Sequence, residues 1–345
     1  MSKQTIEIST WSIIKVIAIL LALVFIYLVK SIIVMVFLSV IIAAAVDAPI
    51  DWLVRHKIRR GFAVAIVYIF SIAIFALIIY LIVPPLAVEI KRLAINIPDY
   101  LGTLEGKLQW LGGKFDIISL KDVLANLGER LGSATGNIFV ATINIFGGVF
   151  SAFIILIISI YLAAEEKGIK KFVVSLVSPG QESYTANLVD RILYKLGAWF
   201  RGQIILMAAI GILVFIVLSI LKVKFALTLA LLAGLLEIVP IIGPIIAAIP
   251  AIFFAFLQSP GLAILTAVLY YIVQEIEKYL LVPQIMKRAL GLNPITIMVA
   301  VLVGAELYGI LGAVVAIPIA AIISIGFTDL MERKRSRERA VEPEK

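Results

Sequence analysis

The chain has 345 residues, of which 63% are hydrophobic and only 15% are charged, and its formal net charge is +8. Soluble domains carry about 45–50% apolar and about 25% charged residues, so the excess apolar surface predicts an integral membrane protein. The basic balance fits Lys and Arg gathered in cytosolic loops, and we expect no nucleic-acid partner. The chain lacks cysteine and has one histidine, His56, so we expect no disulfide, metal site, cofactor or enzymatic activity.

The N-terminal region, residues 1–88, carries apolar runs at 11–27, 31–46 and 61–83. Each has about the 20 residues that a spanning helix needs, so we predict three membrane spans, the third ending at Pro84-Pro85. The segment 47–60 between the second and third runs holds four Lys or Arg residues, which predicts a cytosolic loop. Two crossings before that loop would place the N-terminus in the cytosol as well.

The middle of the chain alternates polar and apolar segments. Residues 89–136 are polar, rich in Gly and balanced in charge, and we interpret them as a small extracytosolic helical region. A fourth span follows at 137–163. The segment up to residue 199 is basic and predicted to be cytosolic and helical. The basic tail, 331–345, predicts a cytosolic C-terminus, so we expect a multi-pass protein of the cell (inner) membrane with both termini inside.

The last third of the chain, residues 200–330, contains two interrupted apolar segments, 225–257 and 293–325. They follow a fifth span at 201–221 and a sixth at 262–282, respectively. About 33 helical residues would be about 50 Å long, well beyond a core of about 30 Å. Central Pro and Gly residues therefore favour two re-entrant helical hairpins, and two further full spans are the alternative. The predicted fold is an all-α bundle of about six spans plus two re-entrant hairpins, or eight spans.

The two interrupted segments also resemble each other. Aligning Glu237 with Glu306 places Gly243 opposite Gly312. A span plus a hairpin crosses the membrane once, so two such units would have opposite orientations. That arrangement is the inverted repeat of many secondary transporters, which bind their solute near the membrane midplane between the repeats. We predict that residues 200–330 form a transport core of this kind.

Short motifs in this region resemble the autoinducer-2 exporter (AI-2E) family. They are Gly234-Leu-Leu-Glu-Ile-Val-Pro-Ile-Ile-Gly-Pro244, Arg201-Gly-Gln203, Gln274-Glu-Ile-Glu277 with Pro283, Leu290-Gly-Leu-Asn-Pro294, and the run from Gly309 to Pro318. The resemblance implies a prokaryotic membrane transporter and a homo-oligomer. Some members are linked to export of autoinducer-2, and others resemble sodium(lithium)/proton antiporters. One departure is Lys278, which stands where the family often has a small or amide residue.

Ionisable groups inside a membrane are costly and persist when they are paired or functional. The candidate substrate- or ion-binding residues are therefore the polar groups of the core, with Na⁺ or H⁺ as the coupling ion that they would hold: Glu237, Glu306, Gln274, Glu275, Glu277 and Lys278. Alternatively, these groups cap half-helices or form an internal Glu–Lys pair. The spacing of Gln274 and Lys278 predicts that they share one helix face.

A second set of candidates shapes the pathway rather than binding in it. Helix-breaking residues predict the two hairpin tips: Pro240, Gly243, Pro244, Gly309 and Gly312. Arg201 and Gln203 are candidates for a gate or for anchors at the membrane interface.

Three functions remain open from the sequence. The first is a secondary transporter that exports a small polar solute such as autoinducer-2 by alternating access, in an elevator-like movement of the core. The second is a sodium(lithium)/proton antiporter. The third is a membrane scaffold or regulator without transport. The sequence holds no G-x-x-x-x-G-K-[ST] motif, so ATP-driven transport by this chain alone is not expected.

Overall fold

A computed structural model describes residues 10–109, 138–286 and 292–341, and every segment of these ranges with regular structure is helical. Four helices are long and apolar enough to cross a membrane, and shorter apolar helices accompany them. Large aliphatic and aromatic side chains cover much of the exterior. Since lipid is the environment that such a surface requires, the chain is an all-α polytopic membrane protein, as the composition predicts.

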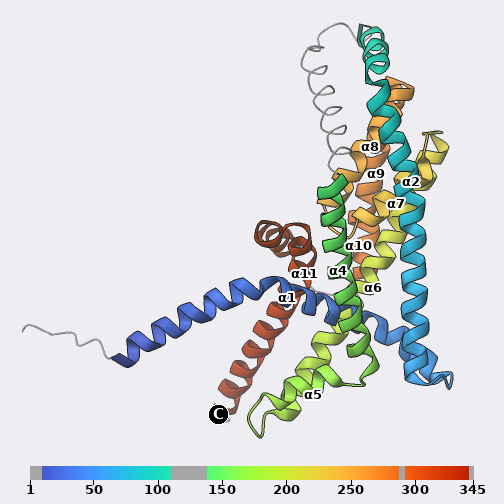
Figure 1. Ribbon diagram of the computed structural model, residues 1–345. Helices are drawn as coiled ribbons and strands as arrows, with labels where there is room; N and C mark the ends of the chain where they lie inside the picture. The colour runs from blue at the N-terminus through green and yellow to red at the C-terminus, as the bar shows by residue number, and fades with distance from the viewer. Residues whose placement is uncertain (1–9, 110–137, 287–291, 342–345) are drawn as a thin grey trace, which may run out of the picture.

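The first helix, α1 (Thr10–Arg55), joins two predicted spans into one element. The expected turn near Lys30 is absent. No Gly or Pro lies near Lys30, and Lys is a good helix former, so one charged residue does not interrupt the helix. At 46 residues, α1 would measure about 69 Å, far more than the bilayer core. Its N-terminal part reaches away from the other helices (Figure 1). The cytosolic position of the N-terminus was predicted from two crossings of the membrane joined by a turn near Lys30. Without that turn, this position stays a prediction.

The second helix, α2 (Arg60–Gln109), runs through Pro84-Pro85, where we predicted the third span to end. The prolines remove N–H donors, but a long apolar helix tolerates such a loss when its other backbone hydrogen bonds are intact. Helix α2 also enters the region that we expected to form an extracytosolic cap. Residues 110–136 of that cap, the sequence motif 290–291 and the end of the tail at 342–345 lie outside the described residues.

The next three helices form the centre of the bundle. They are α4 (Ile138–Ala164), which covers the predicted fourth span, the short α5 (Gly168–Ser175), and α6 (Glu182–Ile220). In Figure 1, α2, α4 and α6 run in roughly the same direction, and the C-terminal part of α1 crosses them near one end. Helix α4 contacts α2, and α1 contacts all three. Helices α2 and α6 continue through residues 88 and 199, so the predicted division into regions at these points stays a prediction.

Helices α7 (Ala226–Leu236) and α8 (Ile242–Gln258) form the first hairpin. Phe225, which precedes α7, meets Phe254 near the end of α8 with ring centroids 5.5 Å apart, so the arms are antiparallel. Ser259 then caps α9 (Pro260–Ile276) by accepting a 3.2 Å hydrogen bond from the Leu262 N–H. A π-helical turn, η1 (Glu277–Leu281), and the short helix α10 (Val282–Met286) continue the chain directly after α9.

The last element, α11 (Pro294–Val341), is the second hairpin, because its backbone leaves helical geometry at Tyr308 and Gly309. Its two arms fold back so closely that a side chain on Gly304 would collide with the Gly312 backbone, and the reverse also holds. Both interrupted segments are thus helical hairpins rather than single straight helices, as the central Pro and Gly residues predicted. Whether they re-enter the membrane from the side that they left stays a prediction.

Among the described residues, buried apolar side chains form three clusters. The largest joins the C-terminal part of α6 to α7, α8 and α9, and another joins the ends of α1 and α4 to the start of α2. The third cluster lies between them and matters most for function. It includes Val239 from the tip of the first hairpin, Ile41 of α1, Trp199 of α6 and Val314 of the second hairpin. Residues of both hairpins therefore belong to one apolar cluster.

Candidate functional site

Glu237 and Glu277 form the centre of a buried polar site. Glu237 lies at the end of α7 and is 1% exposed, and Glu277 opens the π-helical turn and is 9% exposed. Their carboxyl groups lie against each other, within range to share one proton. Gln274, three residues before Glu277, donates a 2.9 Å hydrogen bond to its Oε2. The structure thus joins three of the predicted binding residues from two different helices.

Glu237 is incompletely bonded at this site. Its Oε2 meets no other hydrogen-bond donor in the part of the chain that the structure describes. Two adjacent carboxylates away from water repel each other, and an unpaired charge in an apolar interior is expensive. Within the described ranges, no ion pair includes Glu237 or Glu277. A proton or a bound cation is the simplest way to neutralise such a pair.

Gln203 fixes the position of Glu237 from α6. Its side chain is 2% exposed, and its Nε2 donates a 2.6 Å hydrogen bond to the backbone carbonyl of Glu237. The last carbonyls of a helix lack partners within that helix, and a buried one needs a donor from elsewhere. The gate or anchor role that we predicted for Gln203 stays a prediction, and its observed contact is with another helix. Gln203 holds the broken end of α7 beside the carboxyl pair.

The tip of the first hairpin is strained. Ile241 has φ 72° and ψ −53°, and the Ile242 N–H donates a 2.9 Å hydrogen bond to the Pro240 carbonyl around it. This is a γ-turn of the rare, strained form, and a β-branched residue is unusual in it. Gly243 follows where a Cβ would overlap the Leu236 carbonyl, and Pro244 is buried in the first turn of α8. The breaker residues thus make a sharp tip next to the carboxyl pair.

The other predicted ionisable residues do not join this site. Glu306 is exposed on the second hairpin, and Glu275 is half-buried. Lys278 is exposed and lies 4.7 Å from the ring centroid of Tyr279. Because a π-helical turn holds more residues than an α-helical turn, it rotates the side chains after Glu277. Gln274 faces Glu277, to which it donates its hydrogen bond. A face shared by Gln274 and Lys278 stays a prediction.

Arg201 anchors α6 to α1. Its guanidinium donates hydrogen bonds of 3.2 and 3.0 Å to the backbone carbonyls of Ala44 and Ala45. Pro49 lies four residues after Ala45 and has no N–H, so the Ala45 carbonyl loses its normal helical partner. Arg201 supplies the missing donor. This contact joins two helices, and the gate or interfacial-anchor role that we predicted for Arg201 stays a prediction.

Two further polar contacts connect distant segments, and the sequence pattern does not predict them. Asp329 of α11 is nearly buried and accepts hydrogen bonds from the Tyr184 hydroxyl and, at 3.1 Å, from Arg191. Arg60 pairs with Asp47 at 3.2 Å and also donates to the Ala163 carbonyl at the end of α4. Arg60 belongs to the basic loop that the sequence singles out. The sequence around Asp329 does not distinguish this residue from the solvated acids of the tail.

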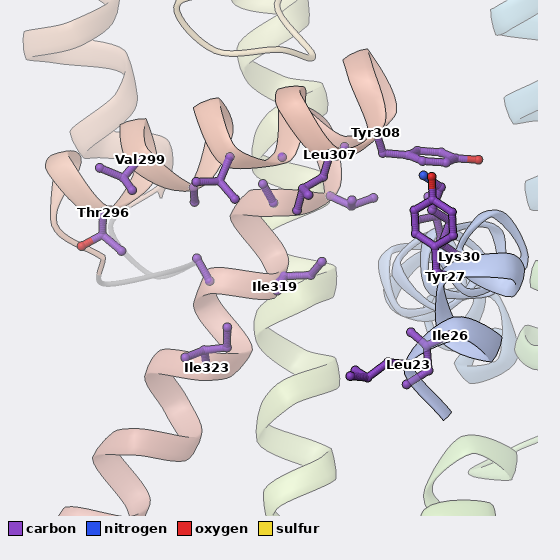
Figure 2. A pocket seen from close by; sticks show the side chains of 18 of the residues that line it. Leu23, Ile26, Tyr27, Lys30, Thr296, Val299, Leu307, Tyr308, Ile319 and Ile323 are labelled. Atoms are coloured by element: carbon purple, nitrogen blue, oxygen red, sulfur yellow. The ribbon is translucent and has the colours of Figure 1, made fainter. Parts of the chain in front are cut away.

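A separate pocket of about 790 Å³ lies between the N-terminal half of α1 and both arms of the second hairpin. Figure 2 shows Leu23 and Ile26 of α1 opposite Ile319 and Ile323 of α11, with Tyr27, Lys30 and Tyr308 together at one end. Most of its lining is aliphatic. It offers few hydrogen-bond partners to a small polar solute, so we distinguish it from the carboxyl site.

Broken helices, a buried carboxyl pair and a lipid-facing exterior define a polytopic membrane protein with the features of a secondary transporter. The sequence matches the family described as AI-2E family transporter over residues 16–332, and the chain belongs to that family. It is therefore a membrane protein of a transporter family, as the sequence motifs predict. The family match extends over both hairpins and over the described helices α1, α2, α4, α5 and α6 before them.

The chain is also similar to individual proteins named as candidate transport proteins. YueF of Bacillus subtilis is 24% identical over 304 residues, which cover 85% of this chain and 82% of YueF. YrrI of the same organism is 25% identical over 305 residues, which cover 86% of each chain. A protein of Haemophilus influenzae is 24% identical over 315 residues and 89% of each chain. The likeness thus extends over nearly the whole length.

Proposed function

We propose that this chain is an ion-coupled secondary transporter in which Glu237 and Glu277 hold the coupling ion. The contact between these two buried carboxyl groups carries the proposal. A carboxyl pair that exchanges its proton for a cation changes charge inside the protein, and such a change can favour one arrangement of the surrounding helices over another. The tip of the first hairpin, where Glu237 is placed, belongs to the cluster that includes residues of both hairpins.

Exchange of protons for sodium or lithium is the activity that this site supports best. The pair offers oxygen ligands, which suit small hard cations, and Gln274 adds an amide at 2.9 Å from Glu277. When the cation leaves, one proton between the two carboxyls would remove the repulsion. Proton and cation would then compete for the same oxygens, which is the basis of antiport.

Export of a small polar solute such as autoinducer-2 is the second candidate. It is supported by the family and by two hairpin tips whose irregular backbone exposes carbonyl and amide groups. In that case the same carboxyl pair would couple a proton or sodium gradient to solute movement. Alternating access, with the hairpins moving against α1 and α6, is our proposal for both activities. We place the protein in the cell membrane and expect a homo-oligomer.

The test is flux in proteoliposomes that hold the purified full chain and a pH-sensitive dye. Addition of Na⁺ or Li⁺ outside should move protons, and Glu237→Gln or Glu277→Gln should slow this at least about tenfold, because one ligand and one titrating group are lost. Glu306→Gln is the matched control and should keep most of the rate, since Glu306 is exposed and outside the site. All variants are first compared by thermal melting in detergent.

Two results would redirect the proposal. If cations move no protons, the same vesicles are used to measure uptake of labelled autoinducer-2 under a proton or sodium gradient, with the same variants. If neither flux is seen, or if Glu306→Gln is as damaging as Glu237→Gln, the carboxyl pair is not the coupling site. Partner binding without any flux would then favour a scaffold.

A further inference from the structure

The pocket between α1 and the second hairpin is separate from the proposed ion site, and its apolar and charged residues have a distinct arrangement. Its volume is about 790 Å³, and one charged side chain, Lys30, is found in its lining. Lys30 lies 4.4 Å from the ring centroid of Tyr27 and 6.0 Å from that of Tyr308. In Figure 2 these three residues cluster at one end, and aliphatic side chains such as Val299 and Ile323 line the rest. The pocket is therefore apolar with a single cationic end.

The cation at this end lacks a carboxylate partner. Among the residues that the structure describes, no ion pair within 4.0 Å includes Lys30. The two aromatic rings stabilise the ammonium group only in part, through cation–π attraction. A Lys beside a large apolar surface usually extends its head to water or finds an anion. The site therefore has room and charge for an anionic group next to long aliphatic walls.

Both sides of the pocket are exposed in this chain, and their chemistry is that of a lipid-facing surface. Leu23 and Ile26 are more than half exposed on α1, as are Val299 and Val303 on the first arm of α11. Lipid acyl chains are the medium around such helices. An amphiphile with an acyl chain and a negative headgroup matches an aliphatic pocket with one cationic end. A small polar solute would leave the aliphatic walls without a partner, and a zwitterionic headgroup would offer the Lys30 ammonium no net negative charge.

We propose that this pocket is a binding site for an anionic phospholipid, with an acyl chain between α1 and the second hairpin and the phosphate group at Lys30. The two tyrosine hydroxyls at the same end are donors that can reach headgroup oxygens. The lipid would tie the protruding half of α1 to the second hairpin. This site is independent of the proposed ion coupling, because Glu237 and Glu277 do not line it.

The test measures lipid binding to the purified full chain, without transport. Delipidated protein in detergent is titrated with fluorescent phosphatidylglycerol or phosphatidylcholine. We expect tighter binding of phosphatidylglycerol, and Lys30→Gln should weaken it about fivefold, the effect of removing one cation near an anionic headgroup. Lys15→Gln is the matched control, because Lys15 also lies on α1 over an aromatic ring, that of Trp11, but outside the pocket. It should leave binding unchanged.

A second variant tests the apolar part of the site. Ala300→Trp fills the pocket from α11 and should weaken binding of both lipids while Lys30 is intact. Equal binding of the two lipids, or equal effects of the Lys30 and Lys15 variants, would overturn the proposal. So would an efficient disulfide between copies in an Ala300→Cys variant of this cysteine-free chain, because a second copy would then cover the pocket. Melting temperatures show whether each variant is folded.

Discussion

The two helical hairpins share a sequence pattern and a glycine packed against a backbone carbonyl, and they differ in where they place their glutamates. The first hairpin holds Glu237 buried at its tip, against Glu277 and under the Gln203 amide. The second hairpin carries Glu306 exposed and closes through direct backbone contact between Gly304 and Gly312. A Glu followed by a Gly at the same spacing thus gives a buried carboxyl site in one case and a tight apolar turn beside a pocket in the other. Neighbouring helices decide which of the two results.

The largest effect that would test this comparison is expected at the glycine contact of the second hairpin. Gly312→Leu places a side chain against the Gly304 carbonyl, where no space exists, so the arms must separate. We expect a loss of about 3 kcal/mol in the free energy of unfolding, the upper end of the cost of overpacking. Equilibrium unfolding in mixed detergent micelles measures this loss.

Gly326→Leu serves as the control, because nothing lies within 4 Å of a Cβ at that position. It should change stability by no more than about 0.5 kcal/mol. If both glycine variants are equally stable, the arms of the second hairpin are not held by their backbone contact, and the comparison with the first hairpin loses its basis.

A smaller effect is expected where Gln203 holds the first hairpin. Gln203→Leu keeps the size of the side chain but leaves the buried Glu237 carbonyl without its 2.6 Å donor. The cost should be about 1–3 kcal/mol, which is the penalty for a buried unpaired polar group. The same unfolding measurement in micelles gives the value.

Glu306→Leu is a comparable change of a long polar side chain on the second hairpin. Since Glu306 is exposed, we expect a change within about 0.5 kcal/mol. A Gln203 variant as stable as the wild type would show that water or another group satisfies the carbonyl, and that the tip of the first hairpin is held by apolar packing alone.

The smallest effects concern the backbone at the two breaks, and they should have opposite signs. Ile241 and Gly309 both have positive φ, 72° and 60°. Ile241→Gly removes strain of about 1–3 kcal/mol at the cost of about 0.5–1 kcal/mol in chain entropy, so it should stabilise by about 1 kcal/mol. Gly309→Ala adds strain and should destabilise by at least about 1 kcal/mol.

Thermal melting of the two variants beside the wild type gives the sign of each change. Destabilisation by Ile241→Gly would mean that the exposed Ile241 side chain contributes more than its strained turn costs. A stabilised Ile241→Gly protein with slower ion flux would indicate that the strain serves transport, which is a common role of unfavourable backbone geometry at functional sites.

The sequence was sufficient for the parts of the fold that depend on local chemistry. Apolar runs predicted the helices, and Pro240, Gly243, Gly309 and Gly312 predicted the two breaks, because missing N–H groups and missing Cβ atoms act within one turn of the chain. The absence of a turn at Lys30 shows the limit of the same reasoning. A single charged side chain is costly to bury in a membrane, but it removes no backbone hydrogen bond, so the helix continues.

The tertiary structure decided which polar residues act together. Glu237 and Glu277 are 40 positions apart by number, and only the packing of α7 against α6 and of the π-helical turn beside it brings the carboxyls into contact. The same holds for Arg201, whose target carbonyl is freed by Pro49 on another helix. Spacing along one helix predicts which residues share a face. Burial and partners across helices depend on packing, which a local pattern does not encode.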